Sequence, residues 1–131
     1  IFFGMARPTL RASLLQRFGE PDSHMIDEDD FETPDGPTLI RLRFDGDNLR
    51  DIEFLHGSLR YRGVELHDNT RWSEIVERLG RFGLRFHESA FLDEGMESSE
   101  LGINIATREQ IGGDKGNNSI KWVIISANFF E

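Results

Sequence analysis

The sequence predicts an α+β domain in which two tandem helix-plus-antiparallel-strand repeats form one sheet with the helices packed on one face. Three observations predict it: a helical motif occurs twice, strand-like segments follow each copy, and the composition is that of a globular domain. The chain has 131 residues, of which 37% are hydrophobic and 30% are charged, enough for one core that folds without disulfides. We therefore expect a single domain over residues 1–131, with repeat one at 1–57 and repeat two at 58–131.

The helical motif has the form T-x-x-x-x-[LI]-[LV]-x-R-[FL]-G and begins at Thr9 and again at Thr70, 61 residues later. Each threonine is a candidate N-cap, because its hydroxyl can accept a hydrogen bond from a free backbone N–H of the first turn. Each copy ends in a glycine, Gly19 or Gly80, the residue preferred just after a helix. In the second copy, four residues at i, i+3, i+4 and i+7 share one face of the predicted helix: Trp72, Ile75, Val76 and Leu79.

Strand-like segments follow each helical motif and are separated by turn signals. Residues 45–48 and 112–118 are rich in Asp, Asn and Gly, which is typical of hairpin turns. The four predicted strands that flank these turns are Leu39–Phe44, Leu49–Leu55, Leu101–Ala106 and Ile120–Ser126. In the first strand Arg41 and Arg43 alternate with apolar residues, so one side should pack on a helix and the other should face water or a partner.

Acidic residues give the chain a net charge of −9, and they are concentrated in two segments. Residues 20–35 and 88–100 contain 13 of the 24 acidic residues and no lysine or arginine. Each segment follows a predicted helix and precedes a predicted strand, so we expect two loops that flank a common acidic surface. Such a surface disfavours nucleic acid as a partner and favours a basic protein. The alternative is that the charge belongs to two solvated linkers and only resists association.

The candidate partner-binding residues are acids of these two segments and one aromatic residue. The acids are Asp27, Glu28, Asp29, Asp30 and Glu32 in the first segment, and Asp93, Glu94 and Glu97 in the second. Trp122 lies in a predicted strand whose two faces are both apolar. If one of these faces is exposed, Trp122 is the expected binding hot spot, and burial in the core is the alternative.

No motif in the sequence indicates catalysis or cofactor binding. There is no cysteine, which excludes thiolate metal sites. The four histidines are His24, His56, His67 and His87. They lack the spacing that places two metal ligands on one helical face, and the acids near His24 lack the spacing of a calcium loop. We therefore expect no catalytic residue, no metal and no cofactor, with a small enzyme that uses paired carboxylates as the alternative.

The two motifs at Thr9 and Thr70, each with the strand that follows it, resemble the β-lactamase inhibitor protein and related small bacterial domains. In that family each copy packs helices on a sheet, and the inhibitor has disulfides, which this chain without cysteine cannot form. A small acidic bacterial protein of this build also resembles the immunity proteins, which neutralise antibacterial toxins. This resemblance implies acidic loops that cover a basic active site, such as that of a nuclease.

The sequence therefore predicts a non-catalytic binding protein, an immunity protein for a cognate toxin, with an adaptor or envelope-assembly module as the alternative. A membrane partner is not expected, because no run approaches the roughly 20 apolar residues of a transmembrane helix. The lack of cysteine and of a leader-like pattern at the start favours the cytoplasm. A periplasmic location is the alternative if a leader was removed before Ile1.

Overall fold

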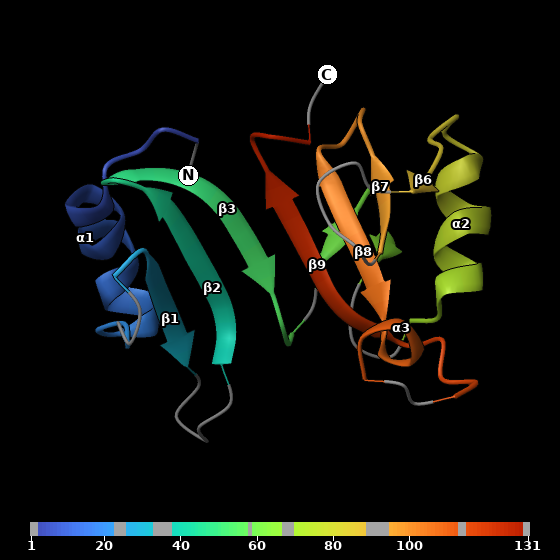
Figure 1. Cartoon of the computed structure of the whole chain (residues 1–131), viewed down its shortest axis with the longest axis horizontal. Coiled ribbons are helices and arrows are strands. Elements are labelled where there is room, and N and C mark those ends of the chain that lie inside the picture. The colour runs from blue at the N-terminus through green and yellow to red at the C-terminus, as the bar shows by residue number, and fades with distance from the viewer. Residues whose placement is uncertain are drawn as a thin grey trace.

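The structure is a computed structural model that describes residues 3–22, 26–32, 38–57, 59–66, 70–88, 95–112 and 115–129. These residues form an α+β fold with three helices, a seven-stranded antiparallel sheet and a small two-stranded sheet (Figure 1). The helices are α1 (Arg7–Phe18), α2 (Trp72–Gly80) and α3 (Arg108–Gly112). The strands are β1 (Glu28–Glu32), β2 (Thr38–Asp45), β3 (Asn48–Phe54), β4 (Arg60–Tyr61), β5 (Val64–Glu65), β6 (His87–Glu88), β7 (Met96–Ser98), β8 (Ile103–Thr107) and β9 (Ile120–Ser126).

The strand order in the large sheet is β1-β2-β3-β9-β8-β7-β6. The two halves of the chain meet where β3 pairs with β9, with Ile52 opposite Ile125 and Phe54 opposite Val123. Consequently β1 is one edge of the sheet and β6 is the other edge, and Figure 1 shows α1 beside the first and α2 beside the second. The strands that follow α1 and α2 in the chain, β1 and β6, therefore lie at opposite edges of the sheet, whereas the corresponding strands β3 and β9 are neighbours.

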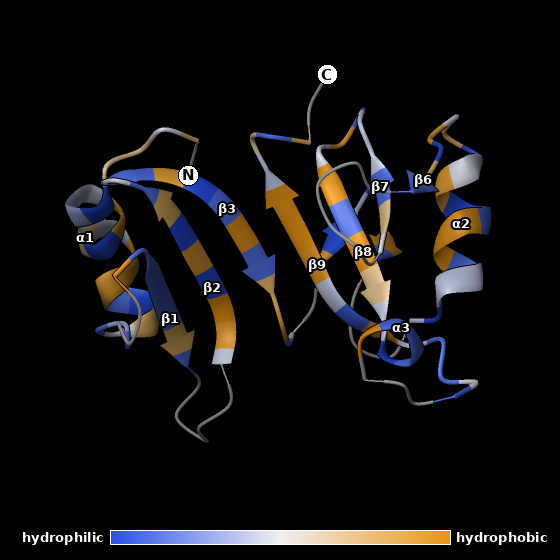
Figure 2. Ribbon diagram, in the orientation of Figure 1, coloured by the Kyte–Doolittle hydropathy of each residue, from blue (hydrophilic) through white to orange (hydrophobic). Residues whose placement is uncertain are grey.

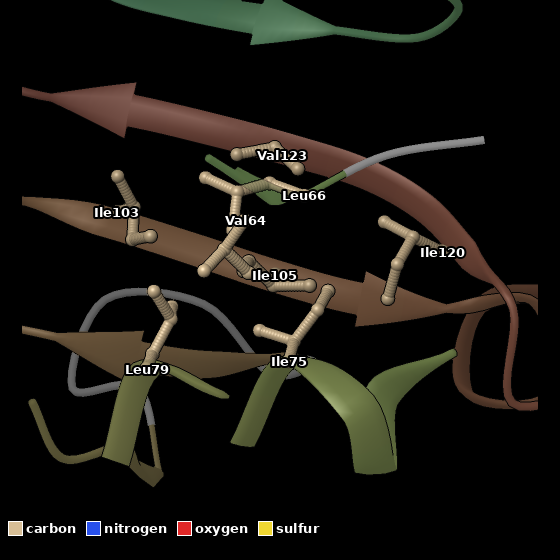
Figure 3. Close-up of a cluster of buried hydrophobic side chains, with 8 residues drawn as sticks. All are labelled: Val64, Leu66, Ile75, Leu79, Ile103, Ile105, Ile120 and Val123. Atoms are coloured by element: carbon tan, nitrogen blue, oxygen red, sulfur yellow. The ribbon is translucent and has the colours of Figure 1, made fainter. Parts of the chain in front are cut away.

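The second half has a core made by α2, β5, β8 and β9. Ile75 and Leu79 of α2 are fully buried and pack with Ile105 and Val123 of the sheet (Figure 3). Val64 of the small hairpin lies in the same cluster. Burial of such a side chain stabilises the fold by about 1.5–3 kcal/mol, so this cluster anchors α2 on the sheet.

The first half has a core of its own beneath α1. Leu10 of α1 is fully buried and packs with Phe31, Leu42 and Phe44. The ring of Phe18 meets that of Phe31 edge to face, with 6.1 Å between the ring centres. Figure 2 shows the corresponding alternation of hydrophobic and hydrophilic bands along β2 and β3. This pattern is the strand periodicity from which β2 and β3 were predicted.

The α+β class and the antiparallel sheet are confirmed, and the four predicted strands correspond to β2, β3, β8 and β9. The helix starts are wrong: α1 follows an N-cap at Ala6 and α2 an N-cap at Arg71, and neither cap makes a side-chain hydrogen bond. Pro8 lies in the first turn of α1, where the missing N–H has no cost, so the helix begins before Thr9. The connection from β8 to β9 also differs from a simple hairpin turn, because it opens with α3.

Candidate protein-binding surface

The first acidic segment contains an edge strand, and the expectation of a loop over residues 28–32 is wrong. Asp29 of this strand is 0% exposed, because it points to the side of β1 that α1 covers. Its carboxylate accepts hydrogen bonds from Nη2 of Arg7 at 2.6 Å and from Nε and Nη2 of Arg11 at 2.8 and 2.7 Å. These hydrogen bonds are the main cause that raises the pKa of the Arg11 guanidinium. Asp29 therefore holds β1 on α1 and is not accessible to a partner.

Two further acids of this strand are neutralised by arginines of β2. Asp30 lies directly opposite Arg41, and Glu28 lies opposite Arg43. Nε of Arg41 donates to Asp30 at 2.8 Å, and Nε of Arg43 donates to Glu28 at 3.0 Å. The hydrogen bond to Asp30 is the main cause that raises the pKa of Arg41. Opposite charges that face each other across strands stabilise a sheet, so Glu28 and Asp30 serve mainly to hold β1 in register.

The same arginines also enclose a buried carboxylate on β3. Glu53 is 3% exposed, and its Oε2 lies 2.8 Å from Nη2 of Arg43 and 3.4 Å from Nη1 of Arg41. Two guanidinium groups thus compensate the loss of water around this acid. The acidic character of the first half is consequently much weaker on this side of the sheet than the sequence suggests.

Exposed negative charge remains at the end of the sheet where β1 begins and β2 turns into β3. We define the acidic tip by Ile26, Asp27, Asp45 and Asp47. The backbone N–H of Phe44 donates to the carbonyl of Asp27 at 2.9 Å, which joins the start of β1 to the β2–β3 turn. All four residues of the tip are exposed, and Ile26 is 93% exposed. The tip therefore combines an exposed apolar side chain with three exposed acids.

The acids of the tip are largely uncompensated. Asp45 pairs with Arg50 at 3.0 Å, but the Asp45 side chain is 72% exposed. The carboxylates of Asp27 and Asp47 form no hydrogen bond or ion pair with any residue that the structure describes. Exposed pairs contribute little to stability, so these charges are available to a partner at small cost to the fold.

Arg7 fixes the shape of the acidic tip from its buried side. Its Nη1 donates to the carbonyl of Ile26 at 2.5 Å and its Nη2 to that of Glu28 at 2.9 Å. Its backbone N–H donates to the carbonyl of Asp47 at 2.8 Å, and its guanidinium lies 4.9 Å from the ring centre of Phe44. Arg7 thus holds the backbone of both the 26–28 segment and the β2–β3 turn, so the tip has a fixed shape without a partner.

The described part of the second acidic segment, residues 88 and 95–100, does not join this surface. Asp93 and Glu94 lie outside the described residues. Glu97 is in β7, next to the far edge of the sheet, and is 2% exposed. The described residues of the two acidic segments therefore do not form the common surface expected from the sequence, because β1 and β6 lie at opposite edges of the sheet. Of the acids expected to bind a partner, Asp27 and Glu32 are exposed.

Trp122 is half-buried in β9. Its indole Nε1–H donates to Oδ1 of Asn104 at 3.0 Å. Asn104 is fully buried in β8, so this hydrogen bond satisfies a polar group that would otherwise be costly to bury. Trp122 belongs to neither of the two core clusters of the described residues, and its indole ring is held by this hydrogen bond to Asn104.

A histidine–serine pair is the feature that most resembles a catalytic site. Nε2 of His87 lies 3.0 Å from Oγ of Ser99, and Nδ1 lies 2.8 Å from the carbonyl oxygen of Glu88. The pair borders a hollow of about 510 Å³. Among the described residues, no carboxylate is bonded to Nδ1, whereas hydrolases use such a carboxylate to support the charged imidazole. The pair does not carry a catalytic proposal.

The described residues contain no group of three or more His, Asp or Glu side chains that could hold a metal ion. His24 lies outside the described residues, so a site with Asp27 has no geometry to assess. No helix in the described part of the chain has the length and apolar character that a membrane crossing needs.

Comparisons of the chain with protein-family models, with curated proteins and with solved structures found no match.

Proposed function

We propose that the protein is a non-catalytic binding protein that docks a basic protein through its acidic tip. The observation that carries this proposal is the exposure of Ile26, at 93%, beside the unpaired carboxylates of Asp27 and Asp47. An apolar side chain in this setting can enter a pocket of a partner, while the surrounding acids attract a cationic surface. The net charge of −9 adds long-range attraction to such a partner.

Within this class, the immunity-protein resemblance favours a toxin as the partner. A nuclease toxin needs a positively charged active site for its own substrate, and an acidic protein that covers the site would block it. We place this function in the cytoplasm, or in the periplasm if a leader is removed. An adaptor that binds a different basic protein is the alternative. Co-expression of the chain with the toxin distinguishes the two, because an immunity protein protects the cells and an adaptor does not.

We further propose that the two halves are versions of one unit, with both helices on the same face of the sheet. The register supports this arrangement. Ile52 packs with the α1 core and Val123 belongs to the α2 core, while their cross-strand partners are Ile125 and Phe54. Residues directly opposite each other on paired strands point to the same face of the sheet, and so do alternate residues of one strand. Ile52 and Val123 therefore point to the same face, which favours both cores on one side of the sheet. The duplicated motif in the sequence supports the same proposal.

Charge reversal at the tip tests the proposed function. The triple variant Asp27→Lys, Asp45→Lys and Asp47→Lys is compared with a control that reverses three exposed acids of the second half, Glu74, Glu88 and Glu109. Both variants change the net charge equally. Basic proteins captured from the native host on the immobilised chain are identified, and their binding rates are measured at two salt concentrations. We expect the tip variant to lower the association rate constant by about tenfold or more, and the control by less than about threefold.

Ile26→Ser separates the apolar contact from the charge. We expect it to raise the dissociation rate constant by about tenfold while leaving the association rate nearly unchanged. Equal losses in the tip variant and in the matched control would remove the tip from the interface. Capture of acidic proteins alone would contradict the proposed class of partner.

A further inference from the structure

A second polar site lies in the other half of the molecule, where the start of α2 meets the connection from β8 to β9 (Figure 1). It is a hollow of about 860 Å³, within the range of roughly 300–1,000 Å³ that small-molecule sites occupy. The side chains that line it are Arg71, Arg108, Lys115, Asn117, Asn118 and Ser119. Of these described lining residues three are cations and none is acidic, although the chain as a whole carries a net charge of −9. We name this site the cationic hollow.

The loop of the cationic hollow is held in place by the two helices beside it. The carbonyls of three consecutive residues, Asn117, Asn118 and Ser119, accept hydrogen bonds from backbone N–H groups at the starts of α2 and α3 at 2.9–3.0 Å. Arg71 also forms a β-bridge with Ser119. A site that is formed before the ligand arrives avoids the cost of ordering it on binding.

The positive charge of the cationic hollow is not balanced within the described structure. Nη1 of Arg108 donates to Oγ of Ser119 at 2.9 Å and to the carbonyl of Ile120 at 2.7 Å, both of which are neutral acceptors. Arg71 and Lys115 are exposed, and their side chains make no ion pair with the described residues. Arg41 and Arg43 in the first half, by contrast, are each bound to carboxylates. Among the described residues, the cations of the hollow are therefore not neutralised by a carboxylate, in contrast to those of the first half.

We propose that the cationic hollow binds a small molecule with a pyrophosphate group. Guanidinium groups bind phosphate oxygens through paired hydrogen bonds, lysine adds a point charge, and amide and hydroxyl groups donate to the remaining oxygens. Two adjacent phosphates can engage three cations at once. The lining contains no aromatic or large apolar side chain among the described residues, so a base or other organic group should add little affinity. A nucleic-acid chain is disfavoured, since most of the surface would repel its backbone.

The experiment is calorimetric titration of the full chain with pyrophosphate at about 50 mM salt, where screening is weak. We expect a dissociation constant of about 10–100 μM, with ADP binding within about threefold of pyrophosphate. The double variant Arg71→Ser and Lys115→Ser should weaken binding by about tenfold or more. Its control, Arg78→Ser and Lys121→Ser, removes two exposed cations outside the hollow and should weaken binding less than about twofold. The amide resonances of residues 117–119 should shift on titration of the parent chain.

Four results would overturn the inference. They are no binding of pyrophosphate at millimolar concentration, equal losses in the two double variants, tighter binding of citrate than of pyrophosphate, and tighter binding of a short oligonucleotide than of ADP. The proposed interaction at the acidic tip is unaffected by any of them, because the two sites lie in different halves of the chain.

Discussion

Replacing Asp29 with alanine is expected to lower the free energy of unfolding by about 3–5 kcal/mol. Asp29 is 0% exposed and joins the edge strand β1 to two arginines of α1. The side chain of Arg7 is only 13% exposed, so removal of the carboxylate leaves a guanidinium that water reaches poorly. The side chain of Arg11 is 39% exposed and should recover most of its hydration. Chemical denaturation followed by circular dichroism measures the change.

Asp27→Ala is the matched control for this substitution, since it removes the same side chain two residues earlier from an exposed position. It should change the free energy of unfolding by no more than about 0.5 kcal/mol. If Asp29→Ala does not fold, the isosteric Asp29→Asn retains one acceptor oxygen and gives a milder loss of the same sign. A loss below about 1 kcal/mol for Asp29→Ala would mean that the ion pairs behave like exposed ones.

Gly95→Ala is expected to lower the free energy of unfolding by about 2–4 kcal/mol, through backbone strain and a steric clash together. Gly95 has φ +86°, and a Cβ at this position would lie 2.2 Å from Oδ1 of Asn104. That oxygen accepts the Trp122 indole N–H, and Asn104 is fully buried. The clash must therefore displace a buried amide that has no room to move. Thermal unfolding gives the loss, and the Trp122 indole N–H resonance reports the hydrogen bond.

Gly63→Ala controls for the backbone alone. Gly63 has φ +80° and nothing within 4 Å of its would-be Cβ, so only the strain of about 1 kcal/mol should appear. The indole resonance should stay in place in this control and move in Gly95→Ala. Similar losses in the free energy of unfolding in both variants would show that contact with Asn104 is not the reason why position 95 requires glycine.

Alternation of apolar and polar residues did not predict all four long strands, since all five residues of β8 are buried. It succeeded for β2, in which Leu42 and Phe44 are buried and alternate with the half-buried Arg41 and Arg43. It failed for β1, in which Asp29 takes a position that an apolar residue would normally occupy. Periodicity cannot identify a strand whose inward position is an acid, since the compensating arginines come from α1, 18 and 22 residues away.

The candidate site was predicted only in part. The sequence showed that the first half is acidic, but not that Glu28, Asp29 and Asp30 are bound by arginines while the Asp27 carboxylate has no partner among the described residues. That distinction depends on strand register and helix packing. The contribution of Asp45 and Asp47 was missed, because an Asp-Gly-Asp turn was interpreted only as a hairpin signal. The cationic hollow was also missed, since Arg71 lies more than 30 residues before Arg108 and Lys115 and meets them only in the fold.

The position of β9 has a consequence for how the protein is made. Of the nine strands in the described residues it is the last along the chain, yet it is the central strand that joins β3 to β8. Ser126 and Asp51, which meet at this junction, are 75 residues apart in sequence. During translation, α1 can pack on β1–β3 before β9 has been synthesised. The edge of β3 then stays unpaired and exposed to solvent until β9 leaves the ribosome. Pauses in synthesis before residue 120 should therefore favour chaperone capture or aggregation, and release of β9 completes both halves in one step.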